Sequence, residues 1–167
     1  PLAKMSTARS AFGLAAVGGK IYAIGGWSGS ATLTSVEVYD PQLGAWAPVA
    51  SMSGTRRCHA LLVLGGKIYA MGGFDSGDTG EVYDPQADSW QRVASMPEGL
   101  QRHAASAMGG KIYMTGGSIE NEEEDEDGDI GDTVVSSVYV YDPQADAWTQ
   151  LASMSGDRRM HASAVGG

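Results

Sequence analysis

The sequence predicts an all-β protein built from repeated four-stranded antiparallel units, the blades of a β-propeller. Two observations carry this prediction. Glycine contributes 24 of the 167 residues, about twice its usual frequency and without a collagen-like period, which indicates many tight turns. In addition, one pattern of motifs occurs three times in full along the chain. A repeated unit with a glycine and aromatic signature is typical of propeller blades.

The repeat consists of short motifs at fixed spacing. Each unit contains Gly-Gly-Lys-Ile-Tyr, a second Gly-Gly pair, Val-Tyr-Asp-Pro, a Trp and a Met. From the second Gly pair to the motif Tyr the spacing is 13, 10 and 24 residues, whereas from that Tyr to the next leading Gly it is 26, 26 and 25 residues. Nearly all variation in length therefore falls in one loop, and the rest of the unit is geometrically fixed.

Four short strands are expected in each unit. In the first unit the apolar run 12–17 ends in a Gly-Gly turn, which joins it to a second strand at 20–24. A third strand at 35–39 stops at Asp40-Pro41, and a fourth covers 46–50. The Pro directly follows a strand, where its missing backbone donor does no harm.

These motifs resemble the kelch repeat, and the resemblance covers essentially the whole chain. It implies that the Gly pair ends the second strand and that the Tyr and Trp pack between blades. The residues in these structural positions are Gly25, Gly26, Tyr39, Trp46, Gly72, Gly73, Tyr83, Trp90, Gly116, Gly117, Tyr141 and Trp148.

The repeat boundaries divide the chain into three whole blades and two partial ones. Residues 1–5 match the end of a preceding blade, and 155–167 match the start of a following one. The whole blades are 6–52, 53–96 and 97–154, the last with an acidic insert at 119–132. Propellers close with about four to eight blades. We therefore expect a piece of a propeller of about six blades, or a half that self-associates through its open blade edges.

The net charge of −9 comes from one segment. Residues 120–132 hold nine acidic residues and no Lys or Arg, while the remainder holds eleven of each sign. The insert is expected to be a solvated loop, with weak cation binding or docking of a basic partner as alternatives. The neutral body excludes the basic face that nucleic acid requires. The longest apolar run, 60–64, is too short to cross a membrane, and the single Cys favours a cytoplasmic location.

One rim of the predicted propeller gathers the variable loops. Strand reversal places loops 27–34, 74–80 and 118–136 beside the inter-blade loops 6–11, 53–58, 97–102 and 155–160. Arg and aromatic residues on this rim predict that it binds a protein or peptide, an acidic one if the guanidinium groups pair with carboxylates. The candidate contacts are Arg9, Trp27, Arg56, Arg57, Phe74, Arg102, Arg158 and Arg159.

Three of these Arg also have a structural interpretation. Arg9, Arg56 and Arg158 each follow a Met by four residues, so a repeated bond to loop carbonyls explains them at least as well as a ligand does. The other three, at 57, 102 and 159, fall outside that register and are better ligand candidates. The two aromatic residues directly follow a Gly pair and fit either partner binding or packing on the rim.

The His and Cys residues are the remaining candidates for metal binding or covalent chemistry. His59, His103 and His161 each follow a Met by seven residues, but the first unit has Phe12 there, so repetition explains them better than a metal ring does. Cys58 lies beside basic residues, but with no second Cys in the chain it is at most a modifiable thiol. No nucleophile elbow, zinc-binding His pair or phosphate loop is present.

The expected function is a non-enzymatic protein-interaction module that needs no cofactor. The kelch resemblance implies two roles for such a module: substrate recognition in a ubiquitin-ligase adaptor, and actin binding. The alternative is a fragment of a galactose-oxidase-like kelch enzyme, in which Cys58 is the only sulfur available for a Tyr–Cys crosslink.

Overall fold

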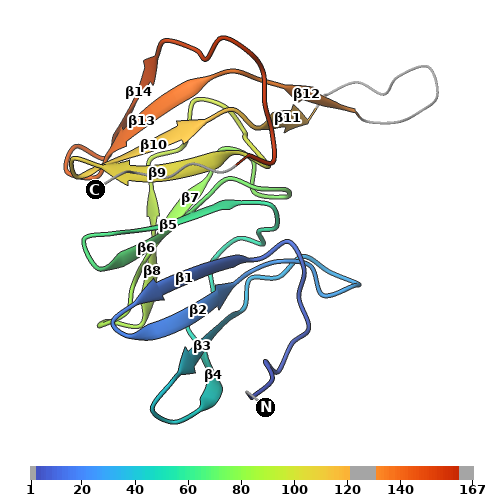
Figure 1. Cartoon of the computed structure of the whole chain (residues 1–167), viewed down its shortest axis with the longest axis vertical. Coiled ribbons are helices and arrows are strands. Elements are labelled where there is room, and N and C mark those ends of the chain that lie inside the picture. Colours follow the sequence, from blue (N-terminus) through green and yellow to red (C-terminus); the bar gives the residue numbers. More distant parts are fainter. Residues whose placement is uncertain (1–2, 121–130, 162–167) are drawn as a thin grey trace.

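The computed structural model describes residues 3–120 and 131–161 and shows three four-stranded antiparallel sheets stacked side by side (Figure 1). The all-β prediction and the four-stranded blades are confirmed. The strands of blade 1 are β1 (Gly13–Val17), β2 (Lys20–Ile24), β3 (Val36–Asp40) and β4 (Ala45–Val49). Those of blade 2 are β5 (Ala60–Leu64), β6 (Lys67–Met71), β7 (Gly80–Asp84) and β8 (Ser89–Val93). Those of blade 3 are β9 (Ala104–Met108), β10 (Lys111–Thr115), β13 (Val138–Asp142) and β14 (Ala147–Leu151).

The blades pack face to face, with their first strands β1, β5 and β9 next to one another (Figure 1). Strand alternation sends one row of apolar side chains to each neighbouring blade. Ile24 and Val36 of blade 1 share a core with Ile68 of blade 2. Met71 of blade 2 likewise shares a core with Ile112 of blade 3. The apolar core therefore lies between blades, and each blade is stabilised by its neighbours.

The motif Tyr and Trp of blades 2 and 3 lie in these seams between blades. The ring of Tyr83 meets that of Tyr22 edge to face across the first seam, with centroids 5.7 Å apart. Trp90 stacks obliquely on Tyr83 and donates from Nε1 to the carbonyl of Ala50 at 2.8 Å. The repeated aromatic residues thus combine packing with a hydrogen bond between blades.

A carboxylate clamps the same seam. Asp88 accepts hydrogen bonds from the backbone N–H of Ala50 at 2.9 Å and from the hydroxyl of Tyr83 at 2.7 Å. Burial and this hydrogen bond raise the pKa of Tyr83. Asp146 repeats both bonds between blades 2 and 3. In blade 1 the corresponding residue is Gly44, so this clamp is specific to the second and third blades.

The second Gly pair is required by the close approach of the next blade. Gly25 and Gly26 have φ values of +60° and +98°, and the N–H of Gly26 donates to the carbonyl of Arg56 at 2.7 Å. A Cβ on Gly25 would lie 2.5 Å from that same carbonyl oxygen. The pair therefore lets two backbones meet where any side chain would separate them.

We expect Gly25→Ala to destabilise the protein much more than Gly18→Ala. Both residues have a φ of +60°, but a Cβ on Gly18 meets no atom within 4 Å. The left-handed conformation itself should cost about 1–2 kcal/mol in either variant, and only the Gly25 variant adds a clash with the next blade. Urea denaturation of both variants measures the difference. Equal losses would show that the close approach is not what requires glycine there.

The expectation of one continuous loop over 118–136 is wrong. β11 (Ser118–Glu120) pairs with β12 (Asp132–Val134), so the two ends of the insert form the strands of a short hairpin. The hairpin projects from blade 3 on the side where the inter-blade loops lie (Figure 1). Residues 121–130 lie outside the described part of the chain, and the expectation of a solvated loop concerns those residues.

Candidate functional site: the loop face

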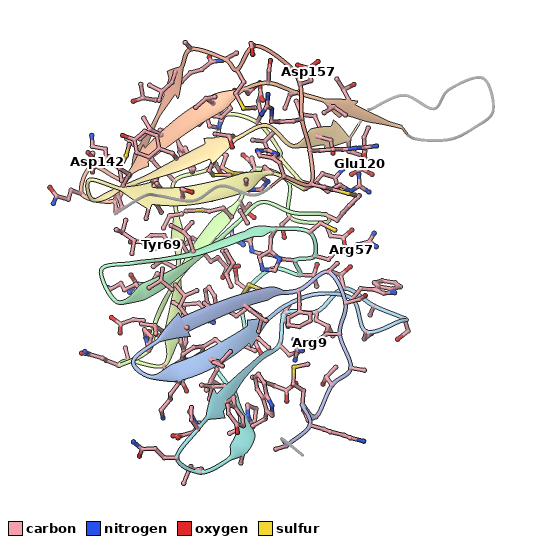
Figure 2. The ribbon with its side chains drawn as sticks, in the orientation of Figure 1. Arg9, Arg57, Tyr69, Glu120, Asp142 and Asp157 are labelled. Carbon is pink, nitrogen blue, oxygen red and sulfur yellow. The ribbon has the colours of Figure 1, made fainter. Side chains whose placement is uncertain are left out.

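The variable loops and the inter-blade loops meet on one face, which we call the loop face, at the right in Figures 1 and 2. Short antiparallel bridges join them. They pair the residue that follows each Gly pair with an inter-blade residue: Ser10 with Trp27, Arg57 with Phe74, and Gln101 with Ser118. These bridges fix the backbone from which the candidate side chains project.

Arg57 is held between two aromatic rings. Its guanidinium carbon lies 5.1 Å from the ring centroid of Trp27 and 4.6 Å from that of Phe74. Among the described residues, its guanidinium makes no hydrogen bond or ion pair. Cation–π contacts thus orient a guanidinium whose donors remain available. The structure brings these three predicted residues together.

Arg102 continues this arrangement toward blade 3. Its guanidinium carbon lies 4.7 Å from the ring centroid of Phe74. It pairs with Asp132 at the start of β12, which also receives a bond from Arg159 at 2.8 Å. Asp132 could not be predicted from the repeat pattern, because it lies in an insert that has no counterpart in the other repeats.

The backbone beneath the loop face adopts left-handed conformations at four equivalent positions. Ala11, Cys58, Arg102 and Met160 have φ values of +50°, +53°, +54° and +52°. Hydrogen bonds link them in order, from the N–H of Cys58 to Ala11, from Arg102 to Cys58, and from Met160 to Arg102. Such conformations cost about 1–3 kcal/mol each in non-glycine residues and persist where surrounding structure enforces them. The inter-blade loops are therefore rigid supports.

Arg9 and Arg56 do not lie on the loop face, which corrects their assignment as partner contacts. The side chain of Arg56 is 1% exposed; it donates to the carbonyls of Gly72 and Thr79 and pairs with Glu81 at 3.1 Å. Arg9 makes the equivalent bonds to Gly25, Ser35 and Glu37. Arg9 and Arg56 therefore make the repeated bonds to loop carbonyls that their structural interpretation predicts.

Glu81 is ionised in this buried pair. Burial opposes ionisation, but bonds from the backbone of Ser53 and from Arg56 outweigh it and lower the pKa of Glu81. The partner Glu could have been found in the sequence. It stands two residues before the motif Tyr in the same two units that carry the buried Arg.

Blade 3 replaces this ion pair with two uncharged residues. Leu100 stands at the position of Arg56, and its carbonyl accepts the equivalent bond, from Gly73. Tyr139 stands at the position of Glu81, and both side chains are buried. Arg158 returns to the Arg register after blade 3 but is exposed, and its side chain has no hydrogen-bond or ion-pair partner among the described residues.

The His residues of the repeat lie at the seams. Burial, together with the charge of Arg56, lowers the pKa of His59 to about 3. Burial likewise lowers the pKa of His103 to about 3, although the carbonyls of Leu100 and Met71 oppose the shift. In the described part of the chain, no three His, Cys, Asp or Glu residues are grouped so that they could hold a metal ion.

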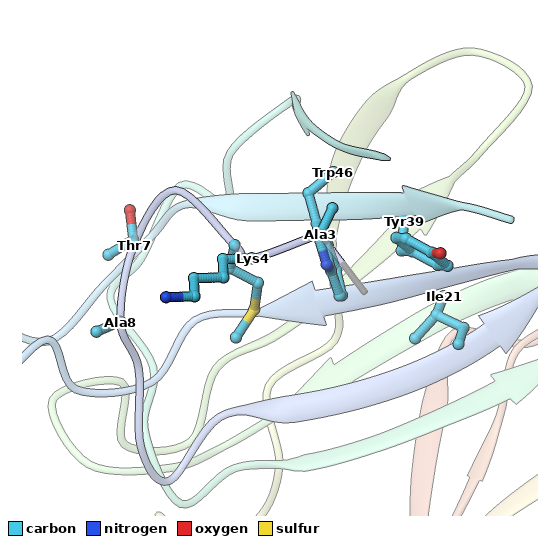
Figure 3. A pocket seen from close by; sticks show the side chains of 8 residues that line it. Ala3, Lys4, Thr7, Ala8, Ile21, Tyr39 and Trp46 are labelled. Carbon is cyan, nitrogen blue, oxygen red and sulfur yellow. The ribbon is translucent and has the colours of Figure 1, made fainter. Parts of the chain in front are cut away.

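A separate apolar cavity of about 510 Å³ lies on the outer face of blade 1 (Figure 3). Ile21, Tyr39 and Trp46 form one wall, and the segment that precedes β1 forms the other. The equivalent face of blade 2 is covered by blade 1, where Trp90 bonds to Ala50. The cavity therefore lies on the face of blade 1 that is equivalent to the face by which blade 2 packs against blade 1.

Stacked four-stranded blades, with Tyr and Trp in the seams and a Gly pair at each close approach, define this protein as a propeller-type repeat protein. Two family models of the kelch motif match it, one at residues 8–53 and 55–97 and the other at 99–155. The chain therefore belongs to the kelch-repeat family. Within the described residues, no helix has the length and apolar character needed to cross a membrane.

A curated relative supports the same assignment. The chain is similar to human Kelch-like protein 33, with 49% identity over 47 residues. This match covers 28% of the chain and 9% of that relative. The chain thus spans only a small part of the relative that it matches, and the similarity extends to about one blade.

Proposed function

We propose that this protein is a non-enzymatic interaction module whose loop face binds an acidic segment of a partner protein. The observation that carries the proposal is Arg57, a guanidinium held between Trp27 and Phe74 with its donors unused by the described residues. A preoriented guanidinium loses little freedom on binding and matches the geometry of a carboxylate. Membership of the kelch-repeat family supports an interaction role.

The aromatic residues give this site its selectivity for an extended segment. Trp27 and Phe74 come from neighbouring blades, so an extended segment that binds Arg57 can also contact both rings. Aromatic residues and Arg dominate the binding energy of protein interfaces, because the rings exclude water around the charged contact. A single small anion would use only the guanidinium.

Two biological roles are consistent with such a face. One is recognition of substrates for a ubiquitin ligase, and the other is binding to actin; both use a protein partner. The open face of blade 1, with the cavity beside Trp46, adds a second contact surface. We propose that this surface supports self-association, because it presents the same residue types that blade 2 presents to blade 1.

Arg57→Ala is expected to weaken binding of a fluorescein-labelled pentaglutamate peptide by about 1.5–3 kcal/mol, the range for hydrogen bonds to charged groups. Fluorescence anisotropy measures the affinity. Lys67→Ala is the matched control, because it removes the same charge from the opposite end of the blade, where Lys67 pairs with Asp84. Pentaglutamine should bind neither form.

Added salt should weaken the same interaction, since partly exposed charge pairs are screened. Equal affinities of the Arg57 variant and the parent would contradict the proposal. So would an equal loss in the Lys67 variant, because net charge alone would then account for binding.

A further inference from the structure

The structure assigns a carboxylate-binding site to Gln101, Arg102 and Arg159, and we propose that Asp132 occupies it until an acidic residue of a partner takes its place. This inference rests on the proposed function and concerns the regulation of the same face. It assigns a role to the first residue of β12, the second strand of the insert hairpin, which the repeat itself does not require.

Three side chains from two inter-blade loops converge on Asp132. The side-chain amide of Gln101 donates to Oδ1 at 2.8 Å, and Arg159 donates to Oδ2 at 2.8 Å. Arg102 donates to the same Oδ2. Both carboxylate oxygens are therefore bound, as they would be in a ligand recognised by paired guanidinium groups.

The site does not need Asp132 in order to form. Arg102 is oriented by its left-handed backbone and by the ring of Phe74, and Gln101 by its bridge to Ser118. These constraints come from the repeat framework and from blade 2. The donors are thus prepared for a carboxylate, whichever chain supplies it.

Asp132 is held weakly enough to be replaced. The side chains of Arg159, Arg102 and Asp132 are 40%, 21% and 15% exposed, whereas those of the buried pair Arg9 and Glu37 are 0% and 4% exposed. Exposed ion pairs contribute about 0–1 kcal/mol. The strand that carries Asp132 is three residues long and, among the described residues, forms a two-stranded sheet with β11; two-stranded hairpins are marginally stable.

Replacement would join two parts of the loop face. Phe74 contacts the guanidinium groups of both Arg57 and Arg102. With Asp132 removed, Arg102 and Arg159 would become available next to Arg57, and an acidic segment could engage all three. Because it is tethered, Asp132 competes at a high effective concentration, and it therefore selects for ligands with more than one carboxylate.

The test compares pentaglutamate binding to the parent chain and to Asp132→Asn, with Asp132→Ser as a second variant. Each substitution should raise the affinity about tenfold, which corresponds to about 1.4 kcal/mol. Asp75→Asn is the matched control. Asp75 directly follows Phe74 and accepts a hydrogen bond from Thr32, so its substitution removes the same charge without freeing a guanidinium. Adding Arg159→Ala to the Asp132 variant should reverse the gain.

The outcomes separate this inference from the proposed function. Unchanged affinity in both Asp132 variants, or an equal gain in Asp75→Asn, overturns the inference. If Arg57→Ala still weakens binding in that case, the loop face remains the binding site and only the role of Asp132 is wrong. If pentaglutamate binds no form of the protein, both proposals fail. Thermal melting of each variant establishes that it is folded.

Discussion

Glu81→Ala is expected to lower the free energy of unfolding by about 3–5 kcal/mol, the usual cost of removing one partner from a buried ion pair. The substitution leaves Arg56 charged and 1% exposed. The guanidinium keeps its bonds to the carbonyls of Gly72 and Thr79, but these do not neutralise it. The N–H groups of Ser53 and Gly54, which donate to Glu81, also lose their acceptor.

Blade 3 supplies the compensating substitutions. Leu100 and Tyr139 fill the corresponding positions without charge, and a hydrogen bond between Tyr139 and Glu98 adds to the effect of burial in raising the pKa of that Tyr. The residue in blade 2 that corresponds to Glu98 is Gly54. The triple variant Gly54→Glu, Arg56→Leu and Glu81→Tyr therefore transfers all three residues of the blade 3 arrangement.

The triple variant should recover most of the stability that Glu81→Ala loses, since well-packed apolar replacements of buried ion pairs are often neutral or better. Urea denaturation at neutral pH of the parent, the single variant and the triple variant measures this. A triple variant as unstable as Glu81→Ala would mean that blade 2 depends on the charges themselves. In that case the similarity between the two blades would be confined to the backbone.

Stability should also fall steeply as the pH drops below about 6.5. His59 and His103 have pKa values of about 3 in the folded protein, against 6.5 for an unperturbed His. Between these values the unfolded chain binds protons that the folded chain excludes, so acid favours unfolding. Each His contributes about 1.4 kcal/mol per pH unit. Because each His is already half protonated in the unfolded chain at pH 6.5, the two together should remove about 3 kcal/mol between pH 6.5 and pH 5.

Blade 1 provides the matched substitution, because Phe12 stands in the same register. The double variant His59→Phe and His103→Phe should show a much shallower decline in unfolding free energy between pH 6.5 and pH 5. Urea denaturation at several pH values gives the slope for both proteins. An unchanged slope would show that other groups cause the acid sensitivity and that these two His are not kept neutral.

The repeat spacing predicted the strands almost to the residue. In blade 1, the expected strand at 20–24 coincides with β2, and the bounds of the other three differ by at most one residue. This success has a physical reason, since a unit that must stack on copies of itself cannot vary in length outside one loop. The insert escaped the prediction for the same reason. Its hairpin has no copy, so the pairing of Glu120 with Asp132 left no pattern.

The site was predicted less completely than the fold. Sequence register separated Arg57 and Arg102 from the repeated Arg positions, and the structure places both beside Phe74. Register could not decide whether Arg9 and Arg56 face a ligand or the interior, because their Glu partners lie 28 and 25 residues away across the variable loop. Comparing the repeats with one another resolves this, since blade 3 lacks both the Arg and the Glu.

The four Trp residues occupy three kinds of environment. Trp90 and Trp148 donate hydrogen bonds across seams, Trp46 lines the cavity on blade 1, and Trp27 contacts Arg57 on the loop face. Indole fluorescence depends on local polarity and on nearby charge. Variants that retain a single Trp would therefore give spectroscopic reporters of three distinct events: separation of blades, occupation of the open face, and arrival of a ligand.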